Sequence, residues 1–186
     1  MAFLARKWLI FWGEKKQREE MMEERQGECF RPLRRRKQEL SREECLEILC
    51  REKRAALGVN GELGYPYVLP LNFYYDSDDG HIYFHCGPKG HKMEAMQKSD
   101  QVCFTVWTEG VRPDSDWAFY VKSVIIFGRA FRLWDQEQKL AKIRRLANKY
   151  FPSQAEVEEE IVKAFARVEI VGIKIVSMTG KLVHER

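Results

Sequence analysis

The feature of this sequence that most constrains its fold is a series of short segments in which apolar side chains occupy every second position. A long segment, at 65–76, places on one side the apolar residues Tyr67, Leu69, Leu71, Phe73 and Tyr75. Alternation of this kind indicates β-strands with one buried face. Other segments that read as strands lie at 54–59, 81–86, 101–107 and 168–178, and at 119–134 as one strand or two around Gly128.

Helical signals are fewer and fall between the strands. Ser41 and Glu44 have the spacing of a capping box at the start of a helix that runs to about Lys53. Further helices are predicted at 92–98, 135–150 and 153–165. About six strands at short spacing, without regular alternation of strand and helix, predict a mainly β fold with peripheral helices. The expected architecture is a six-stranded antiparallel barrel and not a doubly wound sheet.

The length of the chain, 186 residues, is the usual size of one domain. The stretch 14–28 is mostly charged and has no apolar face that could dock on a core. Residues 1–33 are therefore predicted to be a flexible N-terminal extension, and residues 34–186 the folded domain. With 45% hydrophobic and 32% charged residues, the chain has the composition of a globular protein.

Charge, hydropathy and cysteine spacing exclude several functions. A net charge of +4, spread along the chain, does not indicate a nucleic-acid partner. The apolar run from Trp8 to Trp12 is too short for a membrane span or a signal peptide, so a cytoplasmic protein without membrane contact is expected. The five cysteines form no CxxC pair and the four histidines are scattered, which predicts reduced thiols and no metal site.

The segment from Ile82 to Lys92 is the most informative for chemistry. It is a strand that ends in a loop containing Gly87 and Gly90 and then enters a helix at Lys92. A helix start offers free backbone N–H groups and a partial positive charge. With Lys92 and His91 added, this arrangement suits a phosphate. The competing interpretation is that Lys89 and Lys92 are simply solvated.

A proline interrupts the strand that precedes this segment. Pro70 cannot donate a ladder hydrogen bond, so it belongs on an edge strand or at a bulge. An interrupted ladder leaves backbone groups free to meet a planar polar ligand, and an ordinary edge strand is the competing interpretation.

Several motifs, each modest alone, occur together in the order of one known family. They are YPYVLPLNFYYD, HIYFHCGPKGHKMEAM, QVCFTVW, YVKSVIIFGRAFRLWD and IKIVSMTGK. Over roughly residues 34 to 181 the chain resembles the pyridoxamine 5'-phosphate oxidase-like flavin-binding family, and within it the nitroimidazole-resistance (Nim) proteins. The resemblance implies a split β-barrel that forms a homodimer, with FMN held between the subunits.

The resemblance also implies which residues hold the flavin. His91 and Lys92 would bind the FMN phosphate, in agreement with the helix-start argument. The isoalloxazine and ribityl chain would lie along one strand, formed by Val68, Leu69, Pro70, Leu71 and Asn72. Other contacts implied are His85 and Cys86 at the adjacent strand end and Ser123 and Val124 on a later strand. Trp107 would approach the flavin from the partner subunit, or lie in the core or the dimer interface.

One departure from the family bears on the reaction. In the vitamin-processing oxidases an arginine commonly precedes the phosphate-binding lysine, whereas His91 precedes Lys92 here. Oxidation of pyridoxamine phosphate is therefore not expected. The Nim resemblance instead implies an FMN-dependent oxidoreductase that reduces nitroimidazoles and other small nitroaromatic molecules.

His85 is the candidate catalytic residue, because an imidazole can donate a proton near neutral pH. A strand histidine with both nitrogens satisfied at a dimer interface is the structural alternative. Two other functions compete with the enzyme: a non-catalytic protein that binds or stores flavin, and a haem-binding barrel with His85 as axial ligand. Deazaflavin is a further cofactor found within the wider fold.

Overall fold

The computed structural model describes residues 30–184. The chain divides into two compact units, Met1–Arg34 and Arg35–Arg186, and every helix and strand described here belongs to the second. The predicted flexible extension, residues 1–33, lies outside the described residues except for 30–33.

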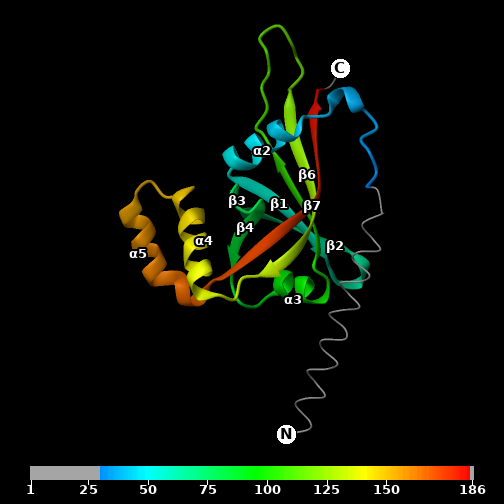
Figure 1. Cartoon of the computed structure of the whole chain (residues 1–186). Coiled ribbons are helices and arrows are strands. Elements are labelled where there is room, and N and C mark those ends of the chain that lie inside the picture. Colours follow the sequence, from blue (N-terminus) through cyan, green and yellow to red (C-terminus); the bar gives the residue numbers. More distant parts are fainter. Residues whose placement is uncertain (1–29, 185–186) are drawn as a thin grey trace. The chain divides into compact units, whose positions relative to one another are not determined.

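Strands dominate this second unit (Figure 1). They are β1 (Arg54–Asn60), β2 (Pro66–Asn72), β3 (Tyr74–Asp76), β4 (His81–Cys86), β5 (Gln101–Trp107), β6 (Val121–Arg132) and β7 (Glu169–Val183). The α-helices are α2 (Arg42–Arg51), α3 (His91–Lys98), α4 (Gln136–Asn148) and α5 (Gln154–Ala164). Short 3-10 turns are η2 (Arg36–Gln38), η3 (Glu62–Gly64) and η4 (Phe165–Arg167).

All strands form one antiparallel sheet in the order β2-β1-β5-β6-β7-β4-β3. The two edge strands, β2 and β3, are consecutive in the chain and are separated only by Phe73. The sheet must therefore curl until its two edges approach each other, which makes a split barrel. The mainly β fold with peripheral helices is confirmed.

The number of strands differs from the prediction because the segment 65–76 is two strands. Its first half pairs with β1 and its second half pairs with β4 at the opposite edge. At the break, the backbone N–H and C=O of Phe73 bond to the hydroxyl of Tyr150 in place of a neighbouring strand. Sequence alternation does not reveal this change of partner, so about six strands were predicted where residues 30–184 form seven.

The main core fills the inside of the curled sheet. Its largest fully buried side chains include Phe73, Phe84 and Phe104, and the rings of Phe73 and Phe104 meet edge to face at 5.2 Å. Helices α2 and α3 add apolar residues to the same cluster. The predicted capping box at the start of α2 is confirmed, because Ser41 and Glu44 each bond to the backbone N–H of the other.

Helices α4 and α5 form a hairpin on the outer side of the sheet (Figure 1). Their apolar faces join residues of β4 and β7 in a second core. Its buried members are Tyr83, Leu133, Ile143, Val157, Ile161 and Ile170. Phe84 of β4 faces the first core and its neighbour Tyr83 the second, because successive strand residues point to opposite faces.

Two further observations concern residues 30–184 as a whole. None of the helices in this range is long and apolar enough to cross a membrane. The four cysteines in the range, Cys45, Cys50, Cys86 and Cys103, are free thiols.

Candidate functional site

The start of α3 has the features of an anion site. Strand β4 ends at Cys86, and the chain turns through Gly90, whose φ of +118° favours glycine. A Cβ built on Gly90 would meet nothing within 4 Å, so the space beside the helix start is open. No described side chain caps the helix, which leaves the backbone N–H groups of His91 and Lys92 available. This donor set fits a phosphate.

His91 connects the anion site to strand β2. Its ring stacks on Tyr67, with centroids 4.1 Å apart and planes inclined by 19°. This contact fixes the beginning of α3 beside the edge strand. Lys92, half-buried on the same helical turn, therefore supplies the positive charge while the His91 ring supplies a planar surface.

Strand β2 is an edge strand, as Pro70 predicted. Its side chains alternate: Val68, Pro70 and Asn72 are exposed, whereas Leu69 and Leu71 are half-buried against the core. Among the described residues, only β1 pairs with β2. The backbone groups along its other edge are therefore free to bond a polar planar ligand. The side chains of Leu69 and Leu71 pack inside the barrel.

His85 lies on the outer face of β4, opposite Ile170 of β7. Its side chain makes no hydrogen bond to another residue of 30–184 that would fix its ring. Although solvent reaches the ring, surrounding atoms desolvate it and the charge of Lys92 acts on it, so its pKa lies below the usual value of 6.5. At pH 7 the imidazole is therefore mainly neutral, with one donor and one acceptor nitrogen.

A cavity of about 310 Å³ lies beside His85. Asn72 and His85 form its wall on the side of the sheet, and the α4–α5 hairpin forms the rest. The helical and connecting residues that line it are Ile143, Leu146, Ala147, Tyr150, Phe151, Glu160, Ile161, Ala164 and Val168. Sequence reasoning predicted both helices, the first of them as amphipathic, but did not place them against His85, because periodicity does not say where a helix docks.

Other predicted site residues are not gathered here. Cys86 and Val124 are buried with their side chains inside the barrel, where the Cys86 sulfur lies 3.4 Å from the sulfur of Met93. Ser123 and Trp107 are cross-strand partners on β6 and β5, separated from β4 by β7. The structure thus brings together Asn72 and His85 in one cavity, and it holds His91 and Lys92 on one helix turn.

The outer face of the sheet carries an apolar patch that sequence reasoning missed. It comprises Val68, Trp107, Ile125, Phe127 and Val176, all of which are exposed. A signal was present in β6, where inward-facing Val124 and Ile126 alternate with outward-facing Ile125 and Phe127. A strand that is apolar on both faces is typical of a sheet covered on both sides.

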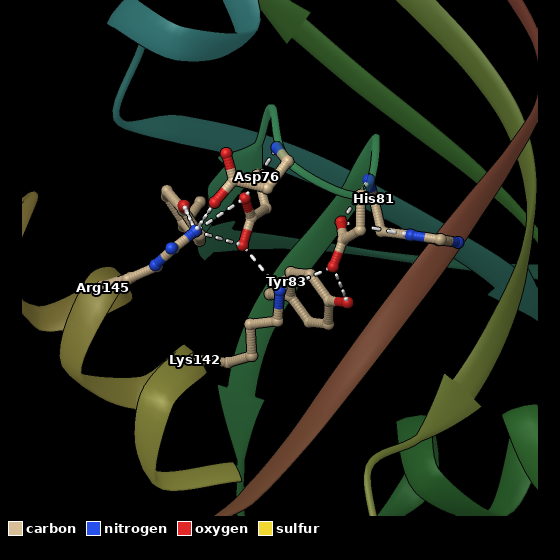
Figure 2. Close-up of polar contacts among 8 residues, drawn as sticks. Asp76, His81, Tyr83, Lys142 and Arg145 are labelled. Carbon is tan, nitrogen blue, oxygen red and sulfur yellow. Dashed lines mark hydrogen bonds and ion pairs between the residues drawn. The ribbon is translucent and has the colours of Figure 1, made fainter. Parts of the chain in front are cut away.

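A cluster of charged residues joins α4 to the β3–β4 turn (Figure 2). Asp76, fully buried, lies 2.6 Å from the Lys142 ammonium and 2.9 Å from Arg145. Lys142 also lies 2.6 Å from Asp79, which accepts a 2.7 Å hydrogen bond from the Tyr83 hydroxyl. Two basic residues one helical turn apart therefore attach the cavity wall to the barrel.

The same contacts perturb the titration of these groups. Burial opposes the charge of Asp79, but hydrogen bonds from Lys142 and Tyr83 outweigh this effect and lower its pKa to about 2. Burial likewise opposes the charge of Asp76, yet Lys142 and the backbone N–H of Asp78 lower its pKa. Both carboxylates are ionised at neutral pH, and the cluster is a structural attachment with its charges paired.

Comparisons with known proteins agree with this architecture. The family model described as pyridoxamine 5'-phosphate oxidase matches residues 41–182. A search of curated proteins finds no match.

Within residues 30–184, no three histidine, cysteine or acidic side chains gather as ligands for a metal ion.

Several solved structures share the fold at low sequence identity. A proposed 5-nitroimidazole antibiotic resistance protein from Bacteroides thetaiotaomicron has a TM-score of 0.64 and 23% identity, covering 78% of this chain and 87% of that one. A FAD-binding protein from Mesorhizobium loti has a TM-score of 0.55 and 24% identity, covering 78% and 96%. A FAD and heme binding protein from Mycobacterium smegmatis has a TM-score of 0.61 and 18% identity, covering 76% and 71%.

Proposed function

The chain belongs to the pyridoxamine 5'-phosphate oxidase family, and on this premise we propose that it binds FMN and reduces small molecules, nitroaromatic compounds among them. The observation that carries the proposal is the arrangement around α3. An uncapped helix start with Lys92 stands beside the edge strand β2, to which His91 is tied by its stack on Tyr67. A phosphate and a flat polar ring system need these two kinds of partner side by side.

Each residue has a distinct role in this proposal. Lys92 and the N–H groups at the start of α3 bind the phosphate, while the free edge of β2 offers backbone hydrogen bonds to the flavin ring. Bound FMN would supply the hydride-transfer chemistry. His85 is neutral at pH 7, so it orients a polar substituent of the substrate by a hydrogen bond without adding charge.

We further propose that the protein is a homodimer. Four members of the exposed patch, Trp107, Ile125, Phe127 and Val176, lie on the neighbouring strands β5, β6 and β7, and Val68 lies on β2, beyond β1. Exposed apolar patches of this kind mark interaction sites. A second copy of the chain would bury it, and Trp107 would then lie near the partner's flavin.

Two other cofactors are supported by specific observations. Solved structures of this fold include one named as FAD-binding and one named as binding FAD and heme. An accessible neutral imidazole such as His85 can also serve as an axial haem ligand. FMN is favoured here because the site built on α3 has one evident phosphate position.

The visible spectrum of the freshly purified protein, followed by identification of what denaturation releases, tests the proposal. Bands near ~375 and ~450 nm with released FMN are expected. Released FAD would correct the cofactor, and a Soret band would replace flavin by haem. A colourless protein that also fails to take up FMN would contradict the proposal outright.

Turnover separates an enzyme from a flavin carrier. We expect His85→Ala to retain FMN but to lower the rate of nitro reduction by about tenfold, the value of a lost hydrogen bond. His85→Gln, which restores a hydrogen-bonding group, should recover part of that loss. If the native protein binds flavin in full but reduces no nitro compound, a non-catalytic flavin carrier is favoured.

A further inference from the structure

The geometry points to the cavity between the α4–α5 hairpin and the sheet as a substrate site, and to an uncharged, mainly apolar molecule as its occupant. This inference deepens the proposed function and rests on it for the reaction that the site would serve. It adds the location of the site, the class of ligand and the residues that select it.

The walls of the cavity are mainly apolar. Six of the lining residues are aliphatic: Ile143, Leu146, Ala147, Ile161, Ala164 and Val168. Phe151 and Tyr150 add aromatic surface, and the Tyr150 hydroxyl is already engaged with the backbone of Phe73 and Lys53. A volume of about 310 Å³ is at the small end of the roughly 300–1,000 Å³ seen for small-molecule pockets. A single substituted ring suits this size.

The remaining polar groups select against anions. Asn72 and His85 offer hydrogen bonds without charge, and Glu160 adds a negative carboxylate to the lining. An anion in the cavity would lose its hydration beside that carboxylate, and no basic residue of the lining would compensate. An uncharged molecule with one or two hydrogen-bonding substituents avoids this penalty and still meets Asn72 and His85.

The cavity wall is anchored in place. Lys142 and Arg145 of α4 hold Asp76 of the barrel at 2.6 and 2.9 Å, on the same helix that contributes Ile143 and Leu146 to the lining. Tyr150, just after the C-terminal end of α4, bonds to the backbone of Phe73. The α4 wall is thus fixed at two points, and a fixed wall costs a ligand little ordering on binding.

Three ligands of the same shape test the charge preference. We would measure binding of 4-nitrobenzyl alcohol, 4-nitrobenzoate and 4-nitrobenzylammonium to the full chain by equilibrium dialysis, with and without flavin. The uncharged alcohol should bind at least about tenfold more tightly than the anion, a difference of ~1.4 kcal/mol. Equal binding of the alcohol and the anion, or tighter binding of the cation than of the alcohol, would overturn the inference.

Matched variants on one helix test the location. Ala164→Trp fills the cavity and should abolish binding of the alcohol, whereas Val162→Trp, at a position 86% exposed and outside the lining, should leave it unchanged. Glu160→Lys reverses a charge of the same site at an exposed position. It therefore still tests the location of the site if Ala164→Trp does not fold. It should strengthen 4-nitrobenzoate binding several-fold, while Glu159→Lys, at the adjacent residue outside the lining, should not.

Flavin binding is measured separately for each variant, so that the two proposals can fail independently. Loss of alcohol binding in Ala164→Trp with FMN affinity intact supports the cavity as a substrate site. If the native protein never binds flavin yet binds the alcohol in this cavity, the proposed function falls and the site stands. If it binds flavin but Ala164→Trp and Val162→Trp bind the alcohol equally, the site is wrong.

Discussion

The hydroxyl of Tyr150 lies 2.9 Å from both the backbone nitrogen and the carbonyl oxygen of Phe73, at the point where one strand changes partner. These two backbone groups have no strand neighbour, and Phe73 is fully buried. The tyrosine therefore satisfies the polar groups that closure of the barrel leaves unpaired.

Tyr150→Phe removes the hydroxyl that bonds to the backbone of Phe73 and leaves the aromatic ring in place. We expect a loss of about 1–3 kcal/mol in the free energy of unfolding, because buried backbone groups lose their partner. Urea denaturation followed by circular dichroism measures the loss. Tyr65→Phe, at a residue that is 74% exposed, is the control. Equal stability of the two variants would show that water replaces the hydroxyl.

Asp76→Asn should weaken the attachment of α4 to the barrel. The substitution removes the buried carboxylate that Lys142 and Arg145 share and leaves them only their ion pairs with Asp79 and Asp78, and removing one partner of a buried ion pair costs about 3 kcal/mol. Thermal unfolding provides the measurement, with Asp114→Asn at an exposed loop position as control. A melting temperature unchanged from the native protein would mean that the apolar faces alone hold the hairpin.

Acid should destabilise the protein between about pH 4 and pH 2. The pKa of Asp79 is about 2 in the folded protein against 3.8 when unperturbed, so the folded state binds fewer protons in this interval. Stability from this group is complete above the unperturbed pKa and is lost as the pH falls toward 2, by at most about 2 kcal/mol. Urea midpoints at pH 5, 4, 3 and 2.5 should fall less steeply in Asp79→Asn than in the native protein. Parallel profiles would exclude Asp79 as the cause.

Lys92→Ala should weaken flavin binding without unfolding the protein. A hydrogen bond to a charged group contributes about 1.5–3 kcal/mol, so we expect a 10- to 100-fold rise in the dissociation constant. Fluorescence titration of the apoprotein with FMN measures it. Lys98→Ala removes the same charge from the other end of α3 and should have little effect. Unchanged affinity in Lys92→Ala would remove Lys92 from the phosphate site.

Ile125→Asp should dissociate the proposed homodimer. Ile125, one of the apolar patch, is 39% exposed, and a carboxylate buried there in a dimer would have no partner. Size-exclusion chromatography with light scattering should give a monomer for this variant and a dimer for the native protein. Val162→Asp places the same charge on α5, away from the patch, and should remain dimeric. A native monomer would refute the dimer itself.

Short-range patterns in the sequence were sufficient to predict most of the helices and strands. Alternating apolar residues predicted the strands, and Ser41 with Glu44 predicted the start of α2, because these signals depend on neighbours within a few residues. Pro70 predicted an edge strand or a bulge, since it cannot donate to a ladder, and β2 is an edge strand. The anion-site geometry at Lys92 was predictable for the same reason, because a strand, a glycine loop and a helix start are contiguous in the chain.

The sequence by itself therefore determined most of the secondary structure, the mainly β class and the helix start that suits a phosphate, all of which follow from short-range chemistry. Only the tertiary structure decided that 66–76 changes partner at Phe73, that α4 docks through Lys142 on Asp76, and that His85 faces a cavity closed by α4 and α5. These features join residues tens of positions apart. Their pairing depends on how the sheet curls and which surfaces it leaves to be covered, and periodicity along one chain does not encode it.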